Sequence, residues 1–300
     1  MLIQEIANHE PLEVSEFKRL LQTDLKAAVS HQAKLVENLD PYSVKRFNQF
    51  KETAHRVFEA LGELNEGFIK LVNAEQGSHH QEGDVATHSL LVFWEVVEFL
   101  SAVEKNPDLL SALRKQTGLE WESIKFVLLV GALFHDITKP EYLVTEDGKT
   151  FFRGRLIEIS RFLHHAETGA EKANSILRSS GVFADSKILE QEIKAIEFII
   201  RYHMVYHCLN AEATNDLIQH GFKFPTYNDP KGIEEIVSSP YLPLLDRFCV
   251  CDRRATWPVK RERDDRIEVG SWPEADQDAI KSLCHKKTSA IKHNPLASTK

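Results

Sequence analysis

The sequence has few cysteines, and they form no pattern. Cys208, Cys249, Cys251 and Cys284 include no CxxC pair and no regular spacing, which argues against a disulfide framework or a structural zinc ribbon. No basic stretch leads into an apolar segment near the N-terminus, and the longest apolar run, residues 126–134, is too short to span a bilayer. We therefore expect a soluble, unsecreted protein of the reducing cytoplasm with no membrane partner.

The chain also lacks an excess of positive charge. Lys and Arg total 37 against 45 Asp and Glu, a net charge of -8, so no overall basic field attracts nucleic acid. This balance favours a small-molecule phosphate or nucleotide as substrate. An RNA or DNA partner is less favoured, because acidic residues are interspersed in the one basic cluster, which comprises Arg253, Arg254, Lys260, Arg261, Arg263 and Arg266.

Signatures of nucleotide-binding folds are absent. There is no GxGxxG, and Gly148-Lys149-Thr150 is not the end of a phosphate-binding loop because Leu143 stands where the earlier glycine is required. Strand-like alternation is scarce. Its clearest instance is residues 142–152, where Asp147-Gly148 predicts the turn of one short β-hairpin.

Helical periodicity dominates the chain, and an apolar share of 42% is enough for a substantial core. Apolar residues recur three and four apart in 35–71, 88–103, 124–135, 168–177 and 188–207. We expect an all-α fold. A polar, glycine-containing link at 75–84 predicts an N-terminal helical region at 1–78, a main domain at 79–259 and, beyond Pro258, a peripheral segment at 260–300.

Several polar residues lie on apolar helix faces, where burial without a partner costs roughly 2 to 7 kcal/mol. His88 lies on a stripe with Leu91, Val92, Glu95 and Phe99. His135 lies at the end of a strongly apolar helix, next to Asp136 and shortly before the helix-breaking Pro140. Such residues need partners.

Two further positions follow the same pattern. Ile196, Ile199 and Ile200 lead along one helix face to His203 and His207, which have the HxxxH spacing of a metal-binding helix. The protease motif HExxH is excluded because Met204 occupies the position of its glutamate. Near the end of the chain, Asp252 lies on a stripe with Leu245, Phe248 and Cys249, where Arg253 or Arg254 could be its partner.

Each residue alone has an ordinary structural explanation: a satisfied core histidine, a capped helix end or a salt bridge. Together they are a ligand set for one or two divalent metal ions. The mixture of imidazole and carboxylate suits Mn, Fe, Co, Ni or Zn, with Mg also compatible. The residues alone do not choose among them.

The order of a histidine, a His-Asp doublet and a late aspartate resembles the HD-domain metal-dependent phosphohydrolases, which are all-helical. The resemblance implies an HD-domain helical bundle with additional N-terminal helices. It also implies that His88, His135, Asp136 and Asp252 are metal ligands.

The stretches "FLHHAETGAEKANSIL" and "IIRYHM" are similar, more narrowly, to the HD region of bacterial tRNA nucleotidyltransferases. Phe162 and Gly169-Ala170 match that pattern, which implies His165, rather than its neighbour His164, and His203 as further ligands. The chain departs from it at three positions: Ala166 replaces a glutamate, while His164 and Thr138 replace glycines. The likeness covers residues 84–257 and includes no nucleotidyltransferase domain, so CCA addition is not implied.

The expected activity is hydrolysis of a phosphoester or phosphoanhydride by metal-activated water. Asp136 would give one oxygen to each of two ions. Lys139 would contact phosphate, with a solvated lysine at a helix end as the alternative, and Arg254 is a weaker phosphate candidate. His207 is open as a ligand, a phosphate contact or a core residue. A di-iron oxygenase and a non-catalytic metal-stabilised sensor or interaction module are the alternative functions.

Overall fold

The protein is described here from a computed structural model, in which residues 14–37, 39, 41, 44–76, 82–152, 155–162, 165–179, 188–205, 230–255, 260–263 and 266–268 are described. They form a helical bundle, so the predicted all-α fold is confirmed. The helices are α1 (Val14–Leu21), α2 (Leu25–Glu37), α3 (Val44–Leu61), α4 (Val85–Glu104), α5 (Pro107–Thr117), α6 (Trp121–Phe134), α7 (His165–Arg178), α8 (Glu190–Tyr202), α12 (Pro230–Ser238) and α13 (Leu242–Ala255), with the short 3-10 helices η1 (Ile69–Leu71) and η2 (Lys139–Tyr142).

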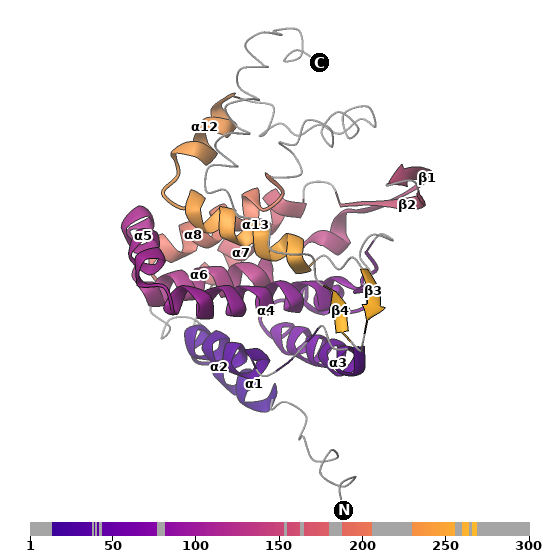
Figure 1. Ribbon diagram of the computed structural model, residues 1–300, viewed down its shortest axis with the longest axis horizontal. Helices are drawn as coiled ribbons and strands as arrows, with labels where there is room; N and C mark the ends of the chain where they lie inside the picture. Colours follow the sequence, from indigo (N-terminus) through magenta and orange to yellow (C-terminus); the bar gives the residue numbers. More distant parts are fainter. Residues whose placement is uncertain are drawn as a thin grey trace, which may run out of the picture.

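Helices α4 and α6 lie side by side through the middle of the bundle (Figure 1). Helices α7, α8 and α13 lie on one side of this pair, and α1, α2 and α3 lie on the other. By length and apolarity α4 could cross a membrane, but 78% of the apolar window is buried inside the protein. In this structure α4 is a core helix.

Local sequence signals fix where these helices begin and end. Asp84 caps α4 by accepting a hydrogen bond from the Thr87 backbone N–H (2.9 Å). Helix α5 begins at Pro107 after the cap Asn106, and it ends where Gly118 adopts a left-handed conformation (φ 68°) that favours glycine. Asp84 and Asn106 thus mark the beginnings of α4 and α5, and Gly118 follows the end of α5.

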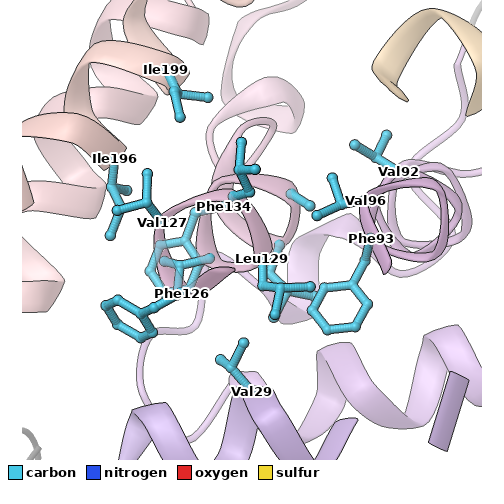
Figure 2. Close-up of a cluster of buried hydrophobic side chains, with 14 of the residues drawn as sticks. Val29, Val92, Phe93, Val96, Phe126, Val127, Leu129, Phe134, Ile196 and Ile199 are labelled. Atoms are coloured by element: carbon cyan, nitrogen blue, oxygen red, sulfur yellow. The ribbon is translucent and has the colours of Figure 1, made fainter. Parts of the chain in front are cut away.

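The core forms around α6, as Figure 2 shows. Side chains of α6 contact α8 on one side, α4 on another and α2 on a third. Each fully buried Val, Leu, Ile or Phe contributes about 1.5 to 3 kcal/mol to folding. Labelled members of this cluster are Val29, Val92, Phe93, Val96, Phe126, Val127, Leu129, Phe134, Ile196 and Ile199.

The N-terminal helices belong to this same core. One continuous cluster of buried apolar side chains runs from Phe17 of α1 to Ala255 of α13. An ion pair between Lys26 of α2 and the buried Glu192 of α8 (2.8 Å) adds a polar contact across the bundle. The predicted boundary at residue 78 therefore does not separate two cores.

Two helix bounds differ from the prediction. The periodic stretch 35–71 is divided, since α2 ends at Glu37 and α3 begins at Val44. Helix α6 ends at Phe134, well before Pro140, because the N–H groups of Ile137 and Lys139 bond carbonyls only three residues back. His135 and Asp136 therefore lie in a tight turn directly after α6, not within the helix.

The predicted hairpin exists, but its predicted turn is wrong. Strand β1 (Leu143–Phe152) pairs antiparallel with β2 (Arg155–Phe162), and Asp147-Gly148 lies inside β1, where the register shifts. Pairing with a separate strand satisfies more backbone groups than a hairpin folded within 142–152. A second hairpin joins β3 (Lys260–Arg263) and β4 (Arg266–Glu268), and the rest of the predicted C-terminal segment lies outside the described residues.

Candidate metal centre

The His-Asp doublet lies directly at the end of α6. His135 caps the helix, and its ring Nδ1 lies 3.0 Å from the Ala132 carbonyl oxygen. Because a carbonyl oxygen can only accept, Nδ1 must donate and therefore carries the proton. In the neutral ring, the lone pair is then on Nε2, which is buried and has no hydrogen-bond partner among the described residues. This is the tautomer that metal binding through Nε2 requires.

Helix α7 approaches the doublet closely because residue 169 is glycine. A Cβ atom there would lie 3.3 Å from the carbonyl oxygen of His135 and 3.4 Å from the Thr138 hydroxyl. That hydroxyl donates to the carbonyl of His165 (2.8 Å), at the first position of α7. The predicted small pair Gly169-Ala170 thus serves helix packing and brings the His165 imidazole to Asp136.

Helix α8 brings His203 to the same place. Its Nδ1 donates to the Ile200 carbonyl (2.7 Å), so the lone pair of the neutral ring is on Nε2, as in His135. That Nε2 lies 3.2 Å from Nε2 of His165. Burial and the neighbouring imidazoles of His165 and His135 lower the pKa of His203 to about 3. His203 is therefore a neutral ligand-type imidazole at ordinary pH.

Helices α4 and α13 contribute His88 and Asp252. Nε2 of His88 lies 3.0 Å from Oδ1 of Asp252, and its Nδ1 lies 3.0 Å from Oε1 of Glu82. Burial alone lowers the pKa of His88, but the hydrogen bonds to Asp252 and Glu82 outweigh it and raise this pKa to about 9. Without a metal ion, His88 is an imidazolium held between two carboxylates.

These residues form two adjacent groups of potential ligands, each with its donor atoms within 4.8 Å of one another. Asp136 lies between them: Oδ2 is 3.3 Å from Nε2 of His135, and Oδ1 is 3.4 Å from Nε2 of His165 and 3.8 Å from that of His203. The first group is His88, His135 and Asp252, and the second is Asp136, His165 and His203.

The chemistry of these groups fits a metal ion. All six side chains are buried, and Nε2 of His135 and Oδ1 of Asp136 have no hydrogen-bond partner in the described part of the chain. Burial raises the pKa of Asp136, but His135, Lys139 and His165 outweigh it and hold this pKa well below its usual range. Lys139 pairs with Oδ2 of Asp136, whereas Oδ1 faces the Nε2 atoms of His165 and His203, which are donor atoms of the kind that bind a metal ion. The two groups could therefore hold a metal ion.

The three predicted phosphate contacts differ in their placement. Lys139 is not the solvated lysine of the alternative explanation, since it is buried with its Nζ 3.0 Å from Oδ2 of Asp136. Arg254 donates to the buried Glu95 of α4 (2.6 Å), which makes it part of an ion pair between α4 and α13. His207 lies outside the described residues. A cation expected beside Asp252 is His88, whose Nε2 lies 3.0 Å from Oδ1 of Asp252.

Sequence reasoning missed two polar residues of the centre, Gln76 and Glu82. Both lie in the 75–84 link, for which the sequence predicts only a connection between regions. Glu82 is buried against His88, and Gln76 accepts a hydrogen bond from Lys139 (2.7 Å). No helical period marks them, and the only available signal was acidic and amide residues shortly before a histidine-bearing helix.

A separate cavity of about 280 Å³ lies between α5, α12 and α13. Its lining includes Asp246 and Arg247 on α13, but none of its described lining residues belongs to either ligand group. The cavity is therefore distinct from the candidate metal centre.

Comparison of the chain with protein-family models, with curated proteins and with solved structures gave no match.

Proposed function

We propose that this protein is a metal-dependent phosphohydrolase of the HD-domain type, which cleaves a phosphoester or phosphoanhydride of a nucleotide or related small molecule. One observation supports this most directly: two buried ligand groups lie side by side and Asp136 directs one oxygen toward each. A carboxylate in that position suits two ions about 3.5 to 4 Å apart, the arrangement used in many phosphate-cleaving enzymes.

The residues of the chain have distinct roles in this proposal. His88, His135 and Asp252 would hold one ion, and His165 and His203 the other, with Asp136 shared. A pair of divalent ions supplies Lewis acidity, which activates water at neutral pH and neutralises charge that builds up on phosphoryl oxygens. The Ala132 and Ile200 carbonyls fix the tautomers of His135 and His203, so both rings present lone pairs without reorganisation.

Substrate would reach the centre from the edge formed by Asp252, Lys139 and His165. Their side chains are 12%, 9% and 7% exposed, whereas those of the other ligands are only 1 to 2% exposed. Lys139 is the cation at this edge, and an ammonium group interacts favourably with an anionic phosphoryl oxygen. Lys139 is therefore the proposed phosphate contact.

Metal analysis combined with a phosphate-release screen tests the proposal. Protein purified without chelators is analysed for Mn, Fe, Co, Ni, Zn and Mg, and then screened against mononucleotides, cyclic nucleotides and short RNA and DNA. We expect bound metal and metal-dependent phosphate release from a small nucleotide, with both lost in Asp136→Ala. Wild-type protein that has metal but releases no phosphate from any substrate would contradict hydrolysis.

The same preparation separates the two alternative functions. An iron-loaded protein that consumes dioxygen with an organic substrate and releases no phosphate would be an oxygenase. A protein that binds metal without any turnover, and whose Asp136→Ala variant loses only stability or a binding partner, would be a metal-stabilised sensor.

A further inference from the structure

Lys139 contacts Gln76, a residue that lies before the part of the chain (84–257) that resembles HD domains. Its Nζ donates to Oε1 of Gln76 (2.7 Å) and to Oδ2 of Asp136 (3.0 Å). Both Lys139 and Gln76 are buried. Two directed hydrogen bonds therefore fix the position of the ammonium group relative to the shared carboxylate.

Gln76 is in turn fixed to the beginning of α4. Its side-chain Nε2 donates to the Asp84 carbonyl (3.2 Å), and its backbone N–H donates to the Gly83 carbonyl (3.3 Å). Glu75 and Asp84 form an antiparallel β-bridge. Both ends of the Gln76 amide are thus used, one on the backbone of the link and the other on Lys139.

The N-terminal helices hold this link through Asp84. The Asp84 carboxylate pairs with His55 (2.9 Å) and with Lys51 (3.2 Å), both on α3. The same carboxylate caps α4, one turn before His88. A chain of polar contacts therefore runs from α3 through Asp84 and Gln76 to Lys139.

We propose that Gln76 is a positioning residue of the phosphohydrolase, which holds the Lys139 ammonium at Asp136 so that it is already placed for a phosphoryl oxygen of the substrate. This inference rests on the proposed function. It assigns to the 75–84 link and to α3 a role in the centre: they support the residue that places its cation.

An amide is suited to this role because it orients the ammonium without neutralising it. A glutamate at position 76 would also accept from Lys139, but its negative charge would compete with the phosphate for the same cation. Two properties of Gln76 are therefore separable by substitution. Gln76→Ala removes the positioning contact, whereas Gln76→Glu keeps the contact and places a second carboxylate, besides Asp136, on the Lys139 ammonium.

The positioning contact is tested first, without using activity. The metal-free full-length chain is treated with an amine-labelling reagent, and the labelling rate of Lys139 is measured by mass spectrometry. We expect Gln76→Ala to label faster by about tenfold or more, the effect of losing one hydrogen bond to a charged group. Gln76→Glu should label no faster than wild type, as should the control Gln116→Ala on the exposed face of α5. An unchanged rate in Gln76→Ala would overturn the proposal.

The catalytic consequence is tested in the metal-loaded protein by a double-mutant cycle. Gln76→Ala should keep wild-type metal content but lower kcat/KM for phosphate release by about tenfold or more. The same substitution should have no further effect in Lys139→Met, because it acts through Lys139. Gln76→Glu should mainly raise KM. Equal losses in the wild-type and Lys139→Met backgrounds would overturn the proposal.

The two experiments distinguish failure of the proposed hydrolase function from failure of the role proposed for Gln76. If wild type releases no phosphate, the proposed function fails, and the labelling rates still decide whether Gln76 holds Lys139. If wild type releases phosphate and Gln76→Ala retains full activity, the proposed function stands and the role of Gln76 is refuted. Thermal denaturation of each variant shows whether it is folded, and Gln76→Glu serves as the second variant if Gln76→Ala is unstable.

Discussion

The two ligand groups balance their charges differently. In the first group, His88 lies between the carboxylates of Glu82 and Asp252, and its pKa is raised to about 9. In the second, the Nε2 atoms of His165 and His203 face one another at 3.2 Å, and the pKa of His203 is lowered to about 3. Each group has two histidines and one aspartate, but His88 of the first is protonated between two carboxylates, whereas His203 of the second is neutral.

This difference indicates how each group behaves without metal. A proton on His88 satisfies both neighbouring carboxylates, so the first group is internally paired. In the second group a proton on His203 is strongly disfavoured, and the shared carboxylate of Asp136 is its one negative charge. Metal binding through Nε2 of His88 must displace a proton, whereas Nε2 of His203 is already free of one; the positive charge beside Asp136 in the second group is the Lys139 ammonium.

The largest expected effect comes from Asp136→Asn, which alters the carboxylate that both groups share. The amide keeps the size of the side chain but loses the charge that would bind both ions in the proposed site. We expect phosphate release to fall by at least about 10³-fold, with loss of metal from both groups. Metal content and steady-state rates measure this. Asp246→Asn, a buried aspartate that lines the separate cavity, is the matched control and should retain both.

Single-ligand variants would sharpen the comparison between the groups. Asp252→Asn should empty the first group while leaving metal in the second, and His203→Gln should do the reverse. Each should lower the affinity for metal at its own group by more than the 10- to 100-fold loss typical when a residue that only orients a ligand is replaced. Titration with Mn²⁺ followed by calorimetry measures the stoichiometry. Loss of all metal in both variants would show that the groups act as a single site.

Glu82→Gln should have a smaller effect, confined to the first group. Oε1 of Glu82 forms an ion pair with Nδ1 of His88 (3.0 Å), on the opposite side of the ring from the Nε2 atom that faces Asp252. We expect about 10- to 100-fold weaker metal binding at the first group and unchanged binding at the second, as for other residues that orient a ligating histidine. Equal weakening at both groups would contradict a local role for Glu82.

The smallest effect is the pH dependence of stability in the metal-free protein. The pKa of His88 is about 9 when folded and near 6.5 when unfolded, so its contribution is full below pH 6.5 and is lost as pH rises through 9. The pKa of His203 is about 3 when folded, so stability also falls as pH decreases from 6.5 toward 3.

Metal-free protein should therefore have its highest thermal midpoint near pH 6.5, with a loss of several degrees toward pH 9. Thermal denaturation in a chelator across this range measures it. Glu82→Gln should reduce the fall of the thermal midpoint between pH 6.5 and 9. His203→Gln should reduce its fall below pH 6.5. A midpoint that does not change between pH 6.5 and 9 would contradict the pairing of His88 with its two carboxylates.

The burial of His88, His203 and Asp252 could be predicted because each continues an apolar stripe, whereas Asp136 follows the end of α6 and His165 was indicated only by the family resemblance. His203 continues the stripe of Ile196 and Ile199, and Asp252 continues that of Leu245 and Phe248, so periodicity alone placed both inside the protein. Because burying a polar side chain without a partner is costly, each of these residues was expected to contact other polar groups. The all-α fold followed from the same periodicity, which is strong in long helices.

The supporting residues could not be predicted, because their positions depend on tertiary contacts. Gln76 and Glu82 lie in a polar link without helical period, and tertiary contacts such as the β-bridge between Glu75 and Asp84 place them beside α4. Arg254 was near Asp252 in sequence, yet it pairs with Glu95, one helix away. The hairpin turn was misplaced because the partner strand, β2, lies beyond the local window.

Anomalous X-ray scattering from crystals grown with Mn²⁺ tests the central claim most directly. Our account predicts an anomalous peak within about 2.0 to 2.3 Å of the donor atoms of His88, His135 and Asp252, or of Asp136, His165 and His203, or one at each group. Manganese bound only elsewhere on the molecule, with both groups lacking a peak, would contradict it.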